Sequence, residues 1–226
     1  MHFHLPKPLH GWREFAGEVG IIVVGVLIAL AAEQVVETIH WKDEVAGARR
    51  SLDAQLADAK FSSIERVRYQ ACISRQLDRL DDIVSASDRP KIYQLNLSPI
   101  RVWGTSAWES ASASGAVAHM SADERNLYAG LFTMTGLIGN MNRNEYDLSG
   151  EVRLLNRPRT LSEGMRDHLI QDIARLRQLN FILALGSRQW LDEAKPLHLP
   201  LPPEDADELR HPRPCGMPDQ VPAKGS

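Results

Sequence analysis

The chain has 226 residues, a formal net charge of −3 and 6% aromatic residues. This length provides for one domain with its own hydrophobic core beside any membrane segment. The slight negative charge and the lack of a basic stripe argue against nucleic-acid binding. The two cysteines, Cys72 and Cys215, lie too far apart for the C-x-x-C spacing of a zinc site, and they neither require nor exclude an oxidising compartment.

The first pronounced feature is the apolar run at residues 19–32, VGIIVVGVLIALAA. As a helix its fourteen residues span roughly 21 Å, less than the roughly 30 Å of a bilayer's hydrocarbon core. Apolar flanks extend the helix enough to cross, provided that Glu18 and Glu33 lie near the two interfaces. We therefore predict a transmembrane anchor over residues 15–36, preceded by a cytoplasmic arm over residues 1–14.

Two other interpretations of this segment stay open. Ala29-Leu30-Ala31 matches an A-x-A cleavage site, so residues 1–31 could be a cleaved signal peptide that leaves a secreted soluble bundle. Against this, Glu18 adjoins the apolar run where a signal peptide carries positive charge, and Trp12 and Arg13 resemble an interfacial collar. The third interpretation is a buried core helix.

One face of the predicted anchor suits contact with another helix. Five positions fall on a single helical stripe, namely Glu18, Ile22, Gly25, Ala29 and Ala32. Gly25 and Ala29 form a small-xxx-small pair, which allows a second helix to approach closely within lipid. Glu18 would reach either the headgroups or a partner helix. The stripe predicts a homo-oligomer or contact with another membrane subunit through the anchor.

The orientation of the anchor is weakly signalled, because Lys and Arg are nearly balanced on its two sides. The basic residues of the short N-terminal segment lie closest to the lipid. We therefore predict a cytoplasmic N-terminus with the main domain on the other side, and a reversed topology stays open.

Beyond the anchor, amphipathic stretches predict an all-α fold. Helices are expected at residues 37–85, 106–119, 122–156 and 163–195, forming an antiparallel helical bundle domain over residues 37–196. No proline occurs between Glu33 and Ser85, so the anchor should continue into the first bundle helix. Arg66 and Gln70 interrupt its apolar stripe, which favours a bundle helix over a strict coiled coil. Residues 197–226 are rich in proline and predict a disordered tail.

Capping signals mark the helix starts. Ser121 and Glu124 match a capping box, as do Thr160 and Glu163. Thr105 or Ser106 should cap the helix that begins at residue 106.

No catalytic, cofactor-binding or metal-binding residue is predicted, and the chain is not expected to be an enzyme. The serines between residues 110 and 114 lack a positioned base, since His119 has no evident acidic partner. Cys72 is expected to be a small core residue rather than a reactive thiol. Trp103 and Trp108 could line a ligand pocket or belong to the core, and Gly115 lies among small residues that allow close helix packing.

The anchor residues carry a resemblance to a known family. Gly17 and Glu18, followed by aliphatic residues and the Gly25-x-Leu27-Ile28-Ala29-Leu30 segment, resemble the anchor of a family of bacterial single-pass membrane proteins. The stretch from Ala107-Trp108-Glu109 to Gly115 is similar to the family's second recurrent block. Many relatives end the anchor with an Asn-rich, Trp-containing segment, whereas this chain delays its tryptophan to Trp41. The resemblance implies an inner-membrane helical protein with a periplasmic domain and without an assigned activity.

The first functional hypothesis is a membrane-anchored scaffold or accessory subunit of a membrane complex. The second is a sensor-like bundle that binds a small ligand near Trp103 and Trp108. The third, an enzyme with a metal site in the bundle core, would need paired E-x-x-H motifs, and the sequence contains none.

Overall fold

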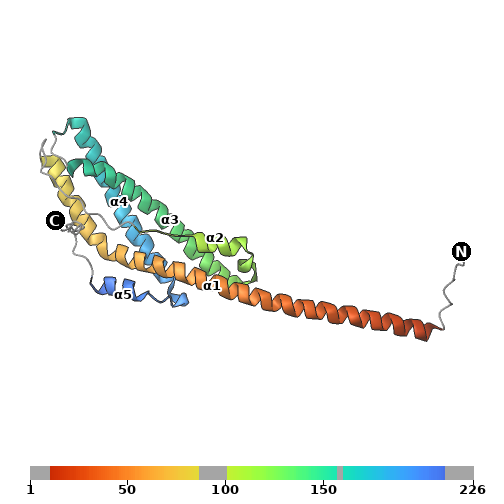
Figure 1. The fold of residues 1–226 in the computed structure, drawn as a ribbon. Helices are drawn as coiled ribbons and strands as arrows, with labels where there is room; N and C mark the ends of the chain where they lie inside the picture. The colour runs from red at the N-terminus through yellow and green to blue at the C-terminus, as the bar shows by residue number, and fades with distance from the viewer. Residues whose placement is uncertain (1–10, 87–100, 157–159, 212–226) are drawn as a thin grey trace, which may run out of the picture. The chain divides into compact units, whose positions relative to one another are not determined.

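The computed structural model describes residues 11–86, 101–156 and 160–211, and no strand occurs among them. The prediction of an all-α fold is confirmed. The elements are α1 (Trp12–Ala86), α2 (Ser106–Ala113), η1 (Ala116–His119), α3 (Ala122–Val152), η2 (Arg153–Asn156), α4 (Glu163–Glu193), η3 (Lys195–Leu197) and α5 (Pro203–Arg210) (Figure 1). The chain divides into two units, residues 1–47 and residues 48–226. The predicted arm falls mostly on residues 1–10, outside the described residues.

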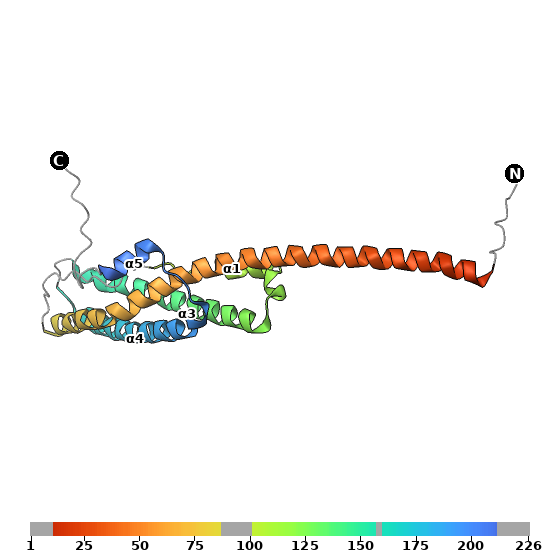
Figure 2. The same ribbon diagram turned by 90° about the horizontal axis from the view of Figure 1, so that it is seen from below.

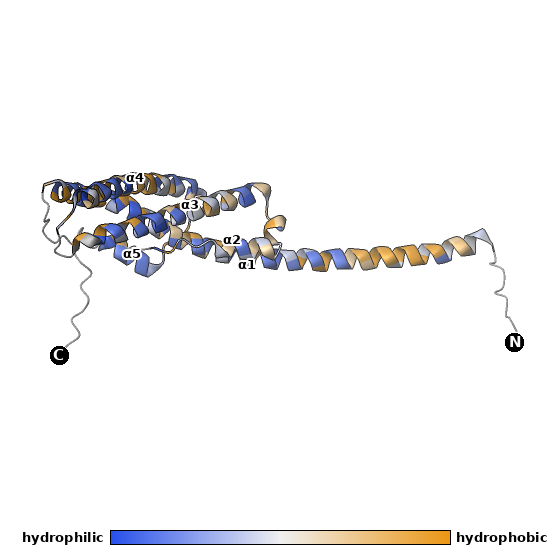
Figure 3. Ribbon diagram, turned by 90° about the horizontal axis from the view of Figure 1, so that it is seen from above, coloured by the Kyte–Doolittle hydropathy of each residue, from blue (hydrophilic) through white to orange (hydrophobic). Residues whose placement is uncertain are grey.

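The first unit contains the N-terminal part of α1. Every side chain from Phe15 to His40 is exposed, and Figure 3 shows this part of α1 to be predominantly hydrophobic. Among the described residues this is the one helical stretch long and apolar enough to cross a membrane. The predicted continuation of the anchor is confirmed, because α1 is a single helix of 75 residues.

The second unit is a bundle in which α1, from Ala48 onward, packs with α3 and α4 (Figures 1 and 2). Ion pairs give the directions of the helices. Arg49 meets Glu124 and Arg66 meets Glu145, so α1 and α3 run parallel. Arg177 of α4 meets Asp78 and Arg188 of α4 donates to Gln70, so α4 runs antiparallel to α1. Sequence patterns did not predict the parallel pair. Because α2 lies at the level of Gln55, near the start of the bundle part of α1, α3 begins at that same end and runs in the same direction as α1.

Apolar side chains from all three helices form the core of the bundle. The twelve largest fully buried side chains among the described residues are Leu52, Leu56, Ile73, Leu77, Leu80, Val84, Leu131, Val152, Ile173, Leu176, Leu183 and Trp190. The indole Nε1 of Trp190 donates to Thr135 Oγ1 at 2.9 Å, so its polar atom is satisfied inside the core. Burial of each such side chain stabilises the fold by about 1.5–3 kcal/mol.

The N-termini of α3 and α4 are capped in different ways. At α3 the predicted capping box is confirmed, since Ser121 Oγ accepts from the backbone N–H of Glu124 at 3.2 Å and Glu124 bonds back to Ser121. At α4 the prediction of Thr160 as the cap is wrong, because Ser162 is the N-cap and accepts from Met165 N at 3.3 Å. The helix begins at Glu163, which places the capping position one residue before it.

The start of α2 also differs from the prediction. Thr105 occupies the N-cap position, but its hydroxyl donates to Glu109 at 2.7 Å instead of accepting from the backbone. The backbone N–H of Ala107 is instead bonded to Gln55 Oε1 of α1 at 2.9 Å. A neighbouring helix therefore supplies the cap that neither Thr105 nor Ser106 provides. Gly115, with φ of 82°, ends this segment in the left-handed region that favours glycine.

The predicted disordered tail differs from the structure at residues 203–210, which form α5. Glu208 of α5 contacts Arg101 at 3.1 Å, and the carbonyl of Leu209 accepts from Arg68. These contacts hold the short helix on the bundle. The rest of the predicted tail, residues 212–226, lies outside the described residues.

The Arg49–Glu124 pair predicts a measurable pH dependence. The hydrogen bond from Arg49 lowers the pKa of the Glu124 carboxyl below its usual value. A carboxyl whose pKa is lower in the folded state stabilises the fold above its unfolded pKa, and this contribution is lost as the pH falls through the folded pKa. We expect Glu124→Gln to reduce the free energy of unfolding by about 0.5–1 kcal/mol at pH 7, with the difference shrinking towards pH 3.

Denaturant unfolding of the full chain at several pH values measures this difference. The matched control is Glu163→Gln, because Glu163 also lies in the first turn of a helix but makes no ion pair among the described residues. A pH-independent difference for Glu124→Gln would contradict the assignment.

Candidate interaction site

The predicted helix-contact face lies on the exposed part of α1. All five of its residues are exposed: Glu18, Ile22, Gly25, Ala29 and Ala32. A Cβ built on Gly25 would meet no atom within 4 Å, so the described part of the chain leaves space beside it. The face is therefore open to an approaching helix.

Trp103 and Trp108 both contact α3. The Trp108 ring stacks on Phe132, with ring centroids 6.0 Å apart and an interplanar angle of 22°. A Cβ added at Gly139 would lie 2.9 Å from Trp103 Cβ, so the absence of a side chain there allows Trp103 to approach the helix closely. Gly115 lies between α2 and η1, with φ of 82°. Neither tryptophan ring lines either section of the groove described below.

The bundle contains a buried polar cluster that the sequence did not predict. Arg66 of α1 donates to both carboxylate oxygens of Glu145 of α3, at 2.6 and 2.7 Å, and to Asn180 Oδ1 of α4 at 3.0 Å. The Arg66 and Glu145 side chains are only 4% and 5% exposed. Asn180 also donates to the carbonyl of Gln70 and to Ser74, both at 3.0 Å.

The cluster joins three helices at one level. These side chains reach one another in only one register of the bundle, and a shift of any helix would leave a charged or polar group buried without a partner. The available sequence signal was that Arg66 interrupts an apolar stripe. Its partners could not be identified from sequence, because they lie 79 and 114 residues away.

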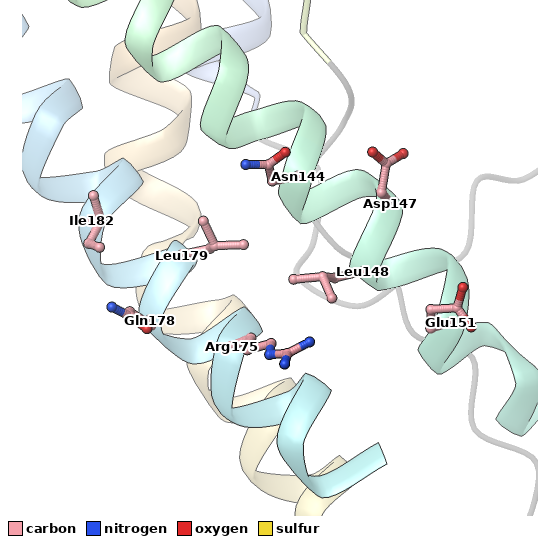
Figure 4. Close-up of a pocket in the computed structure, with 8 residues that line it drawn as sticks. All are labelled: Asn144, Asp147, Leu148, Glu151, Arg175, Gln178, Leu179 and Ile182. Atoms are coloured by element: carbon pink, nitrogen blue, oxygen red, sulfur yellow. The ribbon is translucent and has the colours of Figure 1, made fainter. Parts of the chain in front are cut away.

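A groove runs between α3 and α4, and it has two sections that share Ile182. The first section has a volume of about 550 Å³ and is lined by Asn144, Asp147, Leu148, Glu151, Arg175, Gln178, Leu179 and Ile182 (Figure 4). The second section has a volume of about 200 Å³ and is lined by Met134, Leu137, Ile138, Met141, Ile182, Leu185, Gly186 and Gln189. This groove was not predicted from the sequence.

The walls of the groove combine apolar and charged groups. Leu137 is 53% exposed and Leu185 is 40% exposed, although both belong to helices of a folded bundle. In the first section Asp147 and Glu151 lie on the α3 wall, and Arg175 lies on the α4 wall (Figure 4). Exposed apolar side chains with a polar rim are typical of protein interaction sites.

No three metal-ligating side chains converge in the part of the chain that the structure describes. A buried carboxylate, that of Asp172, lies beneath the surface of α4 and is 1% exposed. It contacts His168 at 3.4 Å and Arg175 at 3.5 Å, both from its own helix. The guanidinium of Arg175 compensates a carboxylate that would otherwise be buried without a counter-charge.

The fold and these surfaces define an all-α protein with a helical bundle and one helix that could span a membrane. No protein-family model, curated protein or solved structure matches the chain. The resemblance to the bacterial membrane family therefore stays a prediction.

Proposed function

We propose that the protein is a single-pass scaffold or accessory subunit of a membrane complex, without catalytic activity. The observation that carries this proposal is the continuity of α1, whose exposed apolar stretch runs directly into a helix of a folded bundle. A bundle of this kind needs no exposed apolar helix for its own core. The apolar stretch serves the lipid bilayer, and the bundle presents surfaces to a protein partner.

The proposed location is the bacterial inner membrane, with the N-terminus in the cytoplasm and the bundle in the periplasm. The resemblance of Gly17, Glu18 and the segment at residues 25–30 to a bacterial membrane family supports this location. Lys7 and Arg13, on the N-terminal side of the apolar run, support the orientation because Lys and Arg favour the cytoplasmic side.

The proposed contact of the anchor uses its small-residue face. Replacing both Gly25 and Ala29 by leucine should place two large side chains where a second helix approaches. We expect the double variant to lose the contact between anchors, with the same chain or with a partner subunit, because helix contacts in lipid depend on close packing. The size of the detergent-extracted complex, together with crosslinking in native membranes, measures this loss.

The matched control is Gly20→Leu combined with Ala31→Leu. It adds the same two side chains to the opposite face of the same helix, and its hydropathy matches that of the test variant. We expect the control to retain the complex. An unchanged complex in the test variant, or equal loss in both variants, would count against the proposed face.

A further inference from the structure

We propose that the groove between α3 and α4 is a self-association surface that binds the same groove of a second copy. This surface lies in the bundle, and its use requires no contact between the anchors. The inference goes beyond the proposed function and stands on different residues.

The apolar floor of the groove supplies the first reason. Leu137 and Leu185 are exposed at its rim, and Met134, Met141 and Ile182 are half-buried along it. α3 and α4 lie side by side as a layer. One face of this layer packs on α1, and the groove lies on the other face. A second pair of helices laid on the open face would complete a four-helix arrangement and remove these side chains from water.

The charges on the walls identify the occupant as a second copy. Asp147 and Glu151 lie on α3, and Arg175 lies on α4 at the same level of the groove, since all three line the same section (Figure 4). Asp147 and Glu151 form no ion pair among the described residues. Arg175 contacts Asp172 of its own helix through Nη1 at 3.5 Å, and its side chain is 60% exposed, so the other donors of its guanidinium can reach a partner.

A two-fold axis parallel to the groove makes these charges complementary. Such an axis keeps each residue at its level and places α3 of one copy opposite α4 of the other. The two carboxylates of each copy then face Arg175 of its partner, and the contact occurs twice. A partner with a different sequence would need this charge pattern by coincidence, whereas a second copy has it by symmetry.

The test uses charge reversal in the full chain carrying Gly25→Leu and Ala29→Leu, kept in detergent or in nanodiscs, so that contact between anchors does not hold the copies together. One variant carries Arg175→Glu, and the other carries Asp147→Arg and Glu151→Arg. Each variant alone should lose the dimer, because like charges then face each other at both contacts. An equimolar mixture should recover the dimer, since the reversed charges of one copy then face the opposite charges of the other at both contacts.

Light scattering coupled to size exclusion measures the mass of each sample, and pull-down between differently tagged copies reports the mixed dimer. Thermal unfolding followed by circular dichroism shows that each variant folds. A second variant, Leu137→Ser with Leu185→Ser, removes the apolar contact without reversing a charge and should also lose the dimer. The control, Arg79→Glu, reverses an exposed charge of α1 that lines neither section of the groove, and it should leave the dimer unchanged.

Three results would overturn the proposal. They are a wild-type chain that stays monomeric at all concentrations, a dimer that survives all the groove variants, and a mixture that fails to recover although each single variant is folded and has lost the dimer. A monomeric wild type would indicate that the groove binds a different protein. Anchor-mediated association is distinguished by Gly25→Leu with Ala29→Leu, which leaves the groove intact.

Discussion

Replacing Glu145 by alanine is expected to lower the free energy of unfolding by about 3–5 kcal/mol. The substitution leaves the guanidinium of Arg66 buried, with only Asn180 as its remaining partner. A buried charge without its counter-ion is far more destabilising than the loss of an exposed pair. Denaturant unfolding of the full chain, followed by circular dichroism, measures the change.

A double variant separates the unpaired charge from the loss of packing. Arg66→Met combined with Glu145→Leu removes both charges and keeps apolar volume at the centre of the bundle. We expect it to recover most of the stability, since apolar replacement of a buried ion pair is often neutral or stabilising. A loss below about 1 kcal/mol for Glu145→Ala would show that the pair contributes like an exposed one.

Placing two arginines in the anchor, Val23→Arg and Leu27→Arg, is expected to remove the protein from the membrane. Each arginine near the centre of a transmembrane helix adds about 2.5–3.5 kcal/mol to the free energy of insertion. Both positions lie in the exposed apolar part of α1, so no contact within the bundle is altered. Carbonate extraction measures the effect, with wild type in the pellet and the variant in the supernatant.

The matched control is Val23→Leu with Leu27→Ile, which should remain in the pellet. Protease added to spheroplasts should digest the wild-type bundle if that domain faces the periplasm. The N-terminal sequence of the mature protein distinguishes an anchor from a signal peptide. A wild-type chain that begins at Ala32 and washes off with carbonate would contradict the proposed anchor.

Local sequence patterns predicted the helices well where the deciding interactions are local. The apolar period predicted helices at residues 122–156 and 163–195, and α3 and α4 lie within these ranges. The box of Ser121 and Glu124 worked because donor and acceptor are three residues apart. The prediction of Thr160 as the N-cap of α4 was wrong because Thr160 and Ser162 both have side chains that can cap a helix, and the structure uses Ser162.

Two structural features that the sequence analysis did not predict had a recognisable local signal, namely α5 and the buried side chain of Arg66. Pro203 begins α5, Glu204 and Asp205 follow in its first turn and Arg210 ends it, which is the charge order that favours a short helix. The proline content of the surrounding segment concealed this pattern. Arg66 likewise stood out in an apolar stripe, but an interruption alone does not indicate a buried partner.

The sequence by itself determined that the chain is helical, that its first helix carries an uninterrupted apolar stretch and that this helix runs on past the charged residues. These properties follow from residues within one or two turns of each other. Only the tertiary structure decided that α1 and α3 run parallel, that Gln55 caps α2, that Arg66 meets Glu145 and Asn180, and that α3 and α4 leave a groove. Each of these depends on which helix faces lie together, and that choice is made by the packing of the whole core.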